Sequence, residues 1–280
     1  MQRINISIVV YKTPKEDLLS VIRSVFLCKE YDCYVYLIDN SPTDTLKGVV
    51  KDIPHLSYEH YPENPGYGRS HNIAIRRSIE DGVSYHFIMN PDIQFDTDVL
   101  SDMVKYMDGH NTVGMMMPKV LNRDGSMQYL PKLLPKPIGV FLRKMKGSET
   151  LCKKFLERYE LRNINEEKIY ETPVISGCFT LLRISALQEV GLYDERYFLY
   201  LEDWDLSRRM HRRYRTLYYP KVHVYHGYEG GSRKSAKLFC IHLKSMISYF
   251  NKWGWFFDNE RKRINKATLT QVGFQQSCGK

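Results

Sequence analysis

The N-terminal part of the chain alternates β-rich runs with a segment of helical periodicity, and this alternation restricts the fold more than any other feature. The runs Ile4–Val10 and Tyr34–Ile38 are rich in β-branched and aromatic residues. Between them, residues 15–28 place apolar side chains at helical spacing. A strand, a helix and a second strand in this order predict an α/β unit, which binds its ligands at the carboxyl ends of the strands.

Polar residues follow each predicted strand at this edge. Asp39 comes after the second strand, where an acidic side chain either binds a base or a ribose or caps the next turn. A third strand over 57–61 leads into a loop with Gly66 and Gly68, and a helix is expected from about Ser70. Two glycines separated by one residue let the backbone approach a ligand closely, so this loop is a candidate part of a binding site.

The fourth predicted strand, Tyr85–Met89, runs into Asn90, Pro91 and Asp92. Pro91 has no N–H to donate to a sheet ladder, so we expect the strand to stop there. Asp92 is then presented at the carboxyl end of the strand. Its carboxylate either holds a divalent cation, and through the cation a diphosphate, or closes an Asx-type turn.

The second half of the chain is expected to contain a helix, a strand, a long loop and a polar helical stretch, over 97–108, 113–117, 122–140 and 148–163. Prolines exclude a long helix from the loop, and a loop of this length is typical of a lid or of a segment that contacts an acceptor.

Three acids crowd together later in the chain. A strand is expected over 174–182, and Gly177 within it indicates a bulge or the close approach of a ligand. Glu202, Asp203 and Asp205 then place three like charges at the start of a helix. Such crowding costs free energy unless a ligand, a metal or the nearby arginines offset it. The alternative is an ordinary helix start, since acids interact favourably with the helix dipole.

Composition narrows the classes of function. The six cysteines form no CxxC pair, which argues against a zinc module or a disulfide framework and favours a reducing cytosol. The first strand begins at once and no run of about 18 apolar residues occurs, so we expect a cytoplasmic protein without a signal peptide or membrane span. Residues 232–266 hold nine Lys and Arg against two acids and so carry most of the net charge of +9. This local basic segment predicts a local acidic partner.

Taken in order, these motifs resemble the inverting family 2 glycosyltransferases with a GT-A fold, and among them the bacterial rhamnosyltransferases of cell-surface polysaccharide synthesis. The resemblance covers residues 4–235 and implies an α/β fold with a mostly parallel central sheet flanked by helices. It implies a Rossmann-like nucleotide-binding half over about 1–95, an acceptor half over about 96–235 and a C-terminal helical extension over 236–280. The motifs that carry it are the strand ending at Tyr11, then Asp39, Asn64, Gly66, Gly68, Asn72, Asn90-Pro91-Asp92, Gly177-Cys178, Glu202-Asp203-x-Asp205 and His226.

The resemblance also implies a role for each motif. The nucleotide-sugar would be bound by Tyr11, Asp39, Asn64, Gly66, Gly68, Asn72 and Asn90. The acceptor side would contain Gly177, Cys178 and Trp204. A divalent cation, Mg²⁺ or Mn²⁺, would be held by Asp92 and His226.

Two of these assignments leave alternatives open. His223 competes with His226 for the metal or diphosphate contact, and either histidine could instead be structural. Asn90 stands where the family's DxD motif has its first Asp, which leaves fewer charged ligands for a metal.

The implied reaction is a single displacement with inversion. An acceptor hydroxyl attacks the anomeric carbon while the nucleotide diphosphate leaves, and a positioned carboxylate takes the hydroxyl proton. Asp203 would be that general base, and Glu202 is the alternative. The implied donor is a dTDP- or UDP-sugar, either dTDP-rhamnose or a UDP-sugar, and the implied acceptor is a saccharide or a lipid-linked saccharide.

The basic segment predicts an amphipathic helix over 238–257, with lysines opposite its apolar side chains. This helix either lies on an anionic membrane surface through residues 237–257 or packs on the catalytic domain with its lysines in solvent. The first alternative places the protein on the inner face of the cytoplasmic membrane.

Two other classes of function fit the sequence less well. A sugar nucleotidyltransferase needs a glycine-rich basic loop after the first strand, and the sequence from Tyr11 to Pro14 contains no glycine. A nucleic-acid-binding protein would spread basic and aromatic groups over a binding face. Here the basic excess is confined to one segment, so no nucleic-acid partner is expected.

Overall fold

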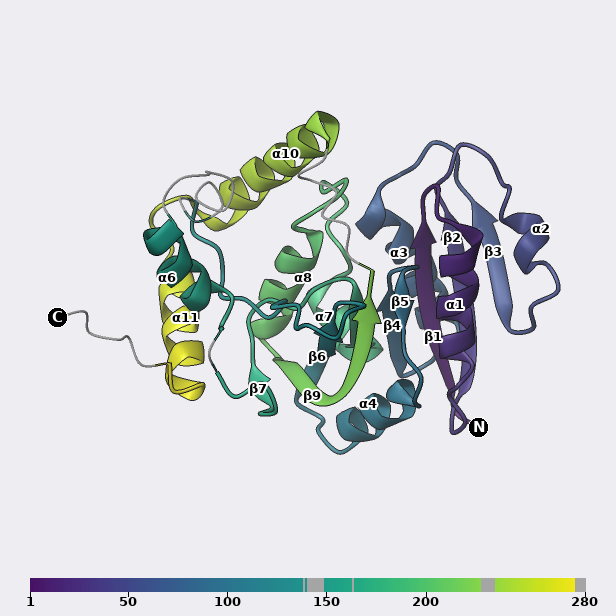
Figure 1. Cartoon of the computed structure of the whole chain (residues 1–280), viewed down its shortest axis with the longest axis horizontal. Helices are drawn as coiled ribbons and strands as arrows, with labels where there is room; N and C mark the ends of the chain where they lie inside the picture. Colours follow the sequence, from purple (N-terminus) through teal and green to yellow (C-terminus); the bar gives the residue numbers. More distant parts are fainter. Residues whose placement is uncertain (138, 140–148, 163, 228–234, 275–280) are drawn as a thin grey trace.

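The computed structural model describes residues 1–137, 139, 149–162, 164–227 and 235–274 (Figure 1). Residues 232–234 and 275–280, which belong to the basic segment and to the predicted extension, lie outside this part. The strands are β1 (Arg3–Val10), β2 (Asp32–Asp39), β3 (Leu56–His60), β4 (Tyr85–Met89), β5 (Ile93–Gln94), β6 (Val113–Leu121), β7 (Tyr170–Glu171), β8 (Phe179–Arg183) and β9 (Arg215–His226). The helices are α1 (Lys15–Val25), α2 (Lys47–Val50), α3 (Tyr67–Glu80), α4 (Val99–Asp108), α6 (Glu149–Tyr159), α7 (Ile184–Val190), α8 (Glu202–His211), α10 (Ala236–Trp253) and α11 (Asn259–Gln271).

The described strands form one nine-stranded sheet in the order β3-β2-β1-β4-β8-β6-β9-β5, with β7 paired to β9. Strands β3, β2, β1 and β4 pair in parallel. Strand β8 is antiparallel to β4 and β6, and β6 and β9 are parallel again. Helix α1 runs roughly along β1 and β2 in the view of Figure 1, α6 and α11 lie at the end of the molecule far from β3, and α10 extends from that end along the top of the view. The central sheet with flanking helices confirms the predicted α/β class.

One apolar core joins the two predicted halves. Ile6 and Ile8 of β1, Phe87 of β4, Met116 of β6 and Leu181 of β8 are all fully buried in the same cluster. The strands of the acceptor half therefore cannot move independently of the strands of the nucleotide-binding half. This shared core fixes the relative positions of the strand ends, where the candidate site lies.

Two element boundaries differ from the predictions because of long-range contacts. Helix α3 begins at Tyr67 rather than Ser70, and the backbone N–H of Tyr67 donates to the carbonyl of Phe198 at 2.8 Å. Strand β8 begins at Phe179, so Gly177 precedes the strand instead of lying inside it. The N–H groups of Ile175 and Gly177 bond to side chains of α8 and not to a neighbouring strand.

Strand β6 continues through Leu121, beyond the predicted end at residue 117. The continuation passes Pro118, and the register against β9 shifts between Pro118 and Lys119. A proline is tolerated in a strand at such an irregularity, because its missing N–H does not interrupt a regular ladder.

The predicted amphipathic helix is α10. Met246, Tyr249 and Phe250 are buried in a small cluster against the catalytic domain. Phe239 and Ile247 remain exposed. The packing alternative therefore holds for part of the apolar face, and membrane contact by the rest stays a prediction. Among the helices that the structure describes, none is long and apolar enough to cross a membrane.

Ser7 of β1 lies between two buried histidines. Its Oγ is 2.6 Å from Nδ1 of His71 and 2.8 Å from Nε2 of His86. The Oγ of Ser78 lies 2.7 Å from Nδ1 of His86. Burial lowers the pKa of both histidines, to about 3 for His86. Both rings are therefore neutral in the folded protein at neutral pH.

Acid is expected to destabilise the fold through these histidines. An unfolded histidine has a pKa of about 6.5, so between this value and about 3 the unfolded chain binds more protons than the folded one. The free energy of unfolding should fall as the pH drops below about 6.5, by up to ~1.4 kcal/mol per pH unit for each histidine. Urea unfolding of the wild type and of His86→Gln at several pH values measures the slope. An equal slope in both proteins would contradict the assignment.

Candidate active site

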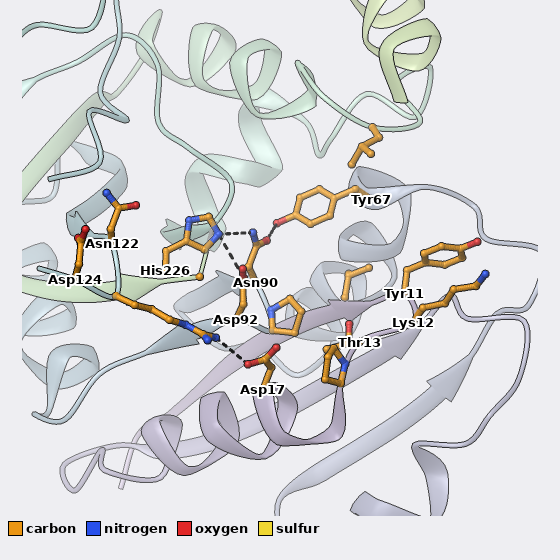
Figure 2. A pocket seen from close by; sticks show the side chains of 16 residues that line it. Tyr11, Lys12, Thr13, Asp17, Tyr67, Asn90, Asp92, Asn122, Asp124 and His226 are labelled. Atoms are coloured by element: carbon orange, nitrogen blue, oxygen red, sulfur yellow. Dashed lines mark hydrogen bonds and ion pairs between the residues drawn. The ribbon is translucent and has the colours of Figure 1, made fainter. Parts of the chain in front are cut away.

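A cavity of about 950 Å³ opens beyond the carboxyl ends of β1 and β4 (Figure 2). Of the predicted site residues, Tyr11, Asn90, Asp92 and His226 line it. The topology explains how residues so distant in sequence meet. Strand β5 follows Asp92 directly and pairs with the end of β9, with Ile93 opposite His226. Asp92 and His226 are thereby brought to the same wall of the cavity.

The ring of His226 is held in one tautomer by Gln128. The amide nitrogen of Gln128 donates to Oδ1 of Asn122 at 2.7 Å and to the carbonyl of His226 at 3.0 Å. Its Oε1 therefore faces Nδ1 of His226, at 3.0 Å, as an acceptor. Nδ1 must carry the proton, so in the neutral ring Nε2 keeps a lone pair, and the side-chain nitrogen of Asn90 lies 3.2 Å from it.

Asp92 faces this lone pair. Its Oδ1 lies 3.4 Å from Nε2 of His226. Burial would raise the pKa of Asp92, but the His226 ring and the charge of Arg123 outweigh it, and the pKa lies below its ordinary value. An ionised carboxylate beside an imidazole nitrogen fits a proton or a divalent cation held between them.

The charged ligands available to a cation are few. Within the described ranges, no group of three or more His, Cys, Asp or Glu side chains could hold a metal ion. This agrees with the expectation that Asn90, in place of an acid, leaves fewer charged ligands. A cation at Asp92 and His226 would need further oxygen ligands from a bound diphosphate or from water, which is the usual situation for Mg²⁺.

Tyr67 connects this wall of the cavity to the acidic cluster. Its hydroxyl lies 2.9 Å from Oδ1 of Asn90 and 2.7 Å from the carbonyl oxygen of Gly177 (Figure 2). The N–H of Gly177 in turn donates to Oδ2 of Asp203 at 3.1 Å. Asp203 does not line the cavity itself. It is connected to Asn90, which does, by hydrogen bonds through Gly177 and Tyr67.

The two candidate bases have different surroundings. The carboxylate of Asp203 accepts hydrogen bonds from the N–H groups of Gly177 and Trp204, at 3.1 and 2.9 Å. Burial raises the pKa of Asp203, and these hydrogen bonds act against the shift. Glu202 is buried, and within the described residues its Oε2 has no hydrogen-bond partner. Burial and the charge of Asp203 raise the pKa of Glu202 well above its ordinary value. Glu202 is therefore the better candidate for a neutral carboxyl and Asp203 for a carboxylate.

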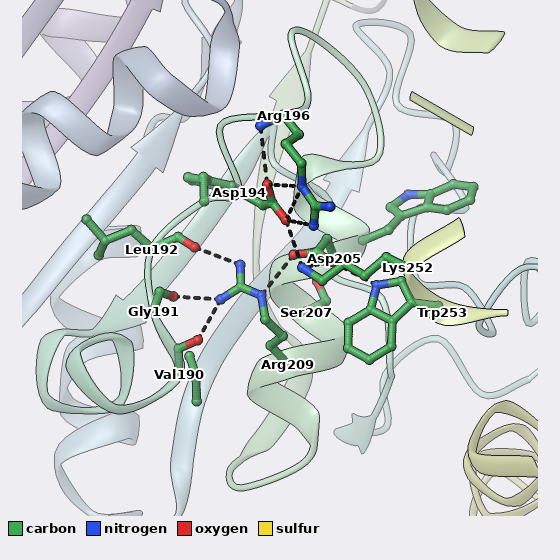
Figure 3. A network of polar contacts seen from close by, with 12 residues as sticks. Val190, Gly191, Leu192, Asp194, Arg196, Asp205, Ser207, Arg209, Lys252 and Trp253 are labelled. Atoms are coloured by element: carbon green, nitrogen blue, oxygen red, sulfur yellow. Dashed lines mark hydrogen bonds and ion pairs between the residues drawn. The ribbon is translucent and has the colours of Figure 1, made fainter. Parts of the chain in front are cut away.

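The third acid of the cluster has a structural role (Figure 3). Asp205 is fully buried, and its Oδ2 accepts from Arg209 at 2.8 Å. Its Oδ1 lies 2.7 Å from Nζ of Lys252 and 2.8 Å from Nε1 of Trp253. Asp205 thus connects the start of α8 to α10. Arg209 and Lys252 offset part of the negative charge that Glu202, Asp203 and Asp205 place at the start of α8.

The residues predicted for nucleotide binding divide into two groups. Tyr11 and Asn90 line the cavity, but Asp39 does not. Asp39 is buried, its Oδ1 accepts from the N–H of Ser41 at 2.8 Å, and its Oδ2 accepts from the hydroxyl of Tyr58 at 2.8 Å. The turn-capping alternative is observed, and a contact from Asp39 to a nucleotide stays a prediction.

Gly66 and Gly68 contact the segment around residues 193–198 and, unlike Tyr67 between them, do not line the cavity. Gly66 has a φ of +100°, and a Cβ there would lie 2.5 Å from the carbonyl oxygen of Phe198. A Cβ on Gly68 would lie 3.1 Å from Cβ of Tyr193. Asn64 accepts a hydrogen bond from the N–H of Gly66 at 3.3 Å. The group that approaches Gly66 is the backbone of Phe198, and the group that approaches Gly68 is the side chain of Tyr193. Contact of these glycines with a nucleotide stays a prediction.

Asn72 also fastens this loop to a distant segment. Its side chain bonds both the N–H and the carbonyl of Tyr193, each at 2.9 Å.

The predicted acceptor-side residues surround Asp203. A Cβ on Gly177 would lie 3.5 Å from Cβ of Asp203. Cys178 is buried, which raises the pKa of its thiol to about 12, and its carbonyl accepts from the N–H of Asn90 at 2.8 Å. Trp204 follows Asp203 and packs edge-on against Tyr249 of α10. Their roles toward an acceptor stay predictions.

The structure separates the two candidate histidines and adds residues that the sequence did not single out. His226 lines the cavity and His223 does not, which favours His226 for the metal or diphosphate contact. Gln128 and Tyr67 were missed. Gln128 stands in a loop without periodicity, and nothing in its sequence context indicates a partner. Tyr67 stands between the two loop glycines, and that position could have marked it.

Comparisons with known proteins agree with this geometry. The glycosyl transferase family 2 profile matches residues 6–191. An N-acetylglucosaminyl-diphospho-decaprenol L-rhamnosyltransferase of Mycobacterium tuberculosis is 26% identical over 262 residues, covering 87% of this chain and 83% of that protein. The rhamnosyltransferase WbbL of Escherichia coli K12 is 27% identical over 195 residues, covering 66% of this chain and 69% of that protein.

Solved structures are similar in fold. The mannosyltransferase PcManGT from Pyrobaculum calidifontis, in complex with GDP-Man and Mn²⁺, superposes with a TM-score of 0.61 at 16% identity, covering 95% of this chain and 68% of that one. GalNAc-T7 with UDP, GalNAc and Mn²⁺ gives a TM-score of 0.59 at 15% identity, covering 88% of this chain and 48% of that one.

The sequence profile and the structural neighbours confirm the resemblance inferred from the ordered motifs and the expected GT-A fold. They also confirm that the chain is a glycosyltransferase. The profile covers the ends of β1 and β4 at the cavity and more than half of the whole chain, but not the end of β9 with His226. The chain belongs to glycosyl transferase family 2.

Proposed function

We propose that the chain is an inverting glycosyltransferase that moves rhamnose, or a similar sugar, from a dTDP- or UDP-sugar to a hydroxyl of a saccharide or lipid-linked saccharide in surface polysaccharide synthesis. The observation that carries the proposal is the cavity with Asp92 and His226 on one wall, joined through Tyr67 and Gly177 to Asp203. The names of the rhamnosyltransferase relatives support the choice of sugar, and one of them names a lipid-linked acceptor.

The donor would bind at the strand ends of the nucleotide-binding half, with its diphosphate near Asp92. Asp92 and Nε2 of His226 would hold a divalent cation, Mg²⁺ or Mn²⁺, and the two structural neighbours solved with Mn²⁺ support this assignment. A bound cation offsets the charge that develops on a leaving diphosphate. Tyr11, Lys12 and Thr13 line the same cavity and are placed to contact the donor.

Asp203 would act as the general base. The N–H groups of Gly177 and Trp204 orient its carboxylate and stabilise the charged form. As the acceptor hydroxyl attacks the anomeric carbon, its proton passes to Asp203 and the bond from that carbon to the diphosphate oxygen breaks. Glu202, buried behind Asp203, remains the second candidate for this role.

We also propose that the protein lies on the inner face of the cytoplasmic membrane. Phe256 and Phe257, in the turn after α10, are 75% and 95% exposed, and Phe239 on α10 is 43% exposed. Lys237 and Lys244 are exposed on the same helix. Exposed aromatic side chains beside lysines are typical of helices that bind anionic lipid surfaces.

Thermal unfolding with nucleotides tests the proposed donor class. A nucleoside diphosphate present at about 100 times its dissociation constant stabilises the fold by about 2.7 kcal/mol, which a melting curve resolves. We expect dTDP or UDP to raise the melting temperature with Mg²⁺ or Mn²⁺, GDP and CMP to act weakly, and a chelator to reverse the effect. If no nucleoside diphosphate shifts the transition, the proposed donor class fails.

A further inference from the structure

A second cavity, of about 320 Å³, lies between α6, α11 and residues 133–136. Helices α6 and α11 stand at the end of the molecule opposite β3 (Figure 1). The cavity has the size of a small-molecule site. Its apolar lining consists of Leu133, Leu134, Phe155, Leu269 and Phe274. The donor cavity shares none of these residues.

The rim of this cavity is basic, and no acid among the described residues neutralises it. Lys136, Arg158, Lys262 and Lys266 line it and are exposed, and no Asp or Glu is among the described residues around it. In the described part of the chain, none of these four side chains forms an ion pair with an acid. Arg261 differs, since it pairs with Asp258. An apolar floor below free cations fits a ligand with a hydrocarbon chain and a phosphate or diphosphate head.

A continuous segment connects this cavity to the candidate base. Lys132 pairs with Val174 in an isolated β-bridge, and its charge favours the ionised form of Asp203. Two residues further on, Leu134 packs with Val174 and Ile264 against Trp204.

The other end of the segment is fixed on α11. The side chain of Asn265 bonds the N–H and the carbonyl of Leu134, at 2.8 and 3.0 Å. Residues 132–136 therefore run from the surroundings of Asp203 directly into the wall of the second cavity.

We propose that this cavity binds the lipid of a lipid-linked acceptor, with the prenyl or acyl chain on the apolar floor and the diphosphate at the basic rim. The inference rests on the proposed function, because it supplies the part of the acceptor that the donor cavity does not accommodate. Residues 254–258, with the exposed Phe256 and Phe257, join α10 to α11, the helix that lines the cavity. The side chains proposed to contact a membrane therefore directly precede the helix at the cavity.

Binding of farnesyl diphosphate, measured by calorimetry without donor or metal, tests the cavity separately from the transferase reaction. We expect the double variant Lys262→Glu/Lys266→Glu to bind at least about tenfold more weakly, because two charge-assisted contacts are reversed in sign. Lys47→Glu/Lys51→Glu, which makes the same charge change on and beside α2, should bind like the wild type. Phe257→Ser, which removes an exposed aromatic outside the cavity, should also bind like the wild type.

Several outcomes would overturn the inference. Equal affinity of the wild type and the Lys262/Lys266 variant for farnesyl diphosphate would exclude the basic rim as the diphosphate site. An equal loss of affinity in Phe257→Ser would assign binding to the exposed aromatic surface outside the cavity. If inorganic diphosphate binds as tightly as farnesyl diphosphate, the rim is an anion site and the apolar floor does not bind a hydrocarbon chain. Phosphatidylglycerol vesicles that displace farnesyl diphosphate would identify a general lipid site.

Kinetics then connect the cavity to the acceptor. In the Lys262/Lys266 variant, KM for a lipid-linked acceptor should rise at least about tenfold and KM for a water-soluble saccharide acceptor should stay unchanged. A rise for both acceptors would contradict the assignment. If neither acceptor is used by the wild type, the proposed function fails, and the calorimetric result on the cavity still stands.

Discussion

Asp203→Asn is expected to slow sugar transfer by about 10²–10⁴-fold and to leave donor affinity nearly unchanged. The amide keeps the shape of the carboxylate but cannot take a proton from the acceptor hydroxyl. In the wild type, the N–H of Gly177 donates to Oδ2 of Asp203 and the N–H of Trp204 donates to Oδ1. In the variant, the new NH₂ group must face one of these two N–H groups. The variant should therefore lose some stability as well. Steady-state kinetics give the rate, and titration with the nucleoside diphosphate gives the affinity.

The matched control is Glu202→Gln. Burial holds the Glu202 carboxyl neutral, and an amide is a close substitute for a neutral carboxyl, so most of the activity should remain. Full activity in Asp203→Asn together with inactivity in Glu202→Gln would transfer the role to Glu202.

The pH dependence gives a second check on Asp203. A base must be ionised, and burial raises the pKa of Asp203. The value of kcat/KM should therefore fall with acid through an apparent pKa above the ordinary aspartate value of about 3.9.

The sequence predicted those parts of the fold that depend on neighbouring residues. The limits expected for β4 agree with the structure, because they follow from a short apolar run that is closed by Pro91. Asp92 could be assigned to a site because polar residues at the carboxyl ends of strands in an open α/β sheet meet at one edge. Asn90 and His226 were assigned to it only through the family resemblance. The topology then brings the end of β9 to that edge.

The contacts that give the site its chemistry depend on partners that no local pattern indicates. The sequence predicts that Gly66 lets the backbone approach a ligand, but in the structure the group that approaches Gly66 is the carbonyl of Phe198. The acids Asp203 and Asp205 cannot be distinguished by spacing. Asp205 differs because it pairs with Lys252. Lys252 lies on α10, far from Asp205 in the sequence, and is adjacent to it only in the fold. The tautomer of His226 likewise depends on Gln128, from a loop with no periodicity.

Asp92→Ala is expected to weaken binding of the nucleoside diphosphate by about 10²-fold in the presence of Mn²⁺ and to have little effect in chelator. The reason is that Asp92 supplies the charged oxygen beside Nε2 of His226, and Ala offers neither charge nor oxygen. Calorimetric titration of the wild type and the variant, with metal and with chelator, separates the metal-dependent part of the affinity. Unchanged affinity in the presence of metal would remove Asp92 from the site.

Gln128→Leu makes the same test more demanding, because Gln128 does not line the cavity and contacts its lining residues through Asn122 and His226. Loss of its Oε1 removes the acceptor for the Nδ1 proton, so the ring is free to protonate Nε2 and its lone pair is no longer directed at Asp92. Groups that orient a metal-binding histidine are typically worth about 10–100-fold in metal affinity. We therefore expect a smaller loss than in Asp92→Ala, again only with metal present. A loss of equal size in chelator would mean that Gln128 supports the loop and not the tautomer of His226.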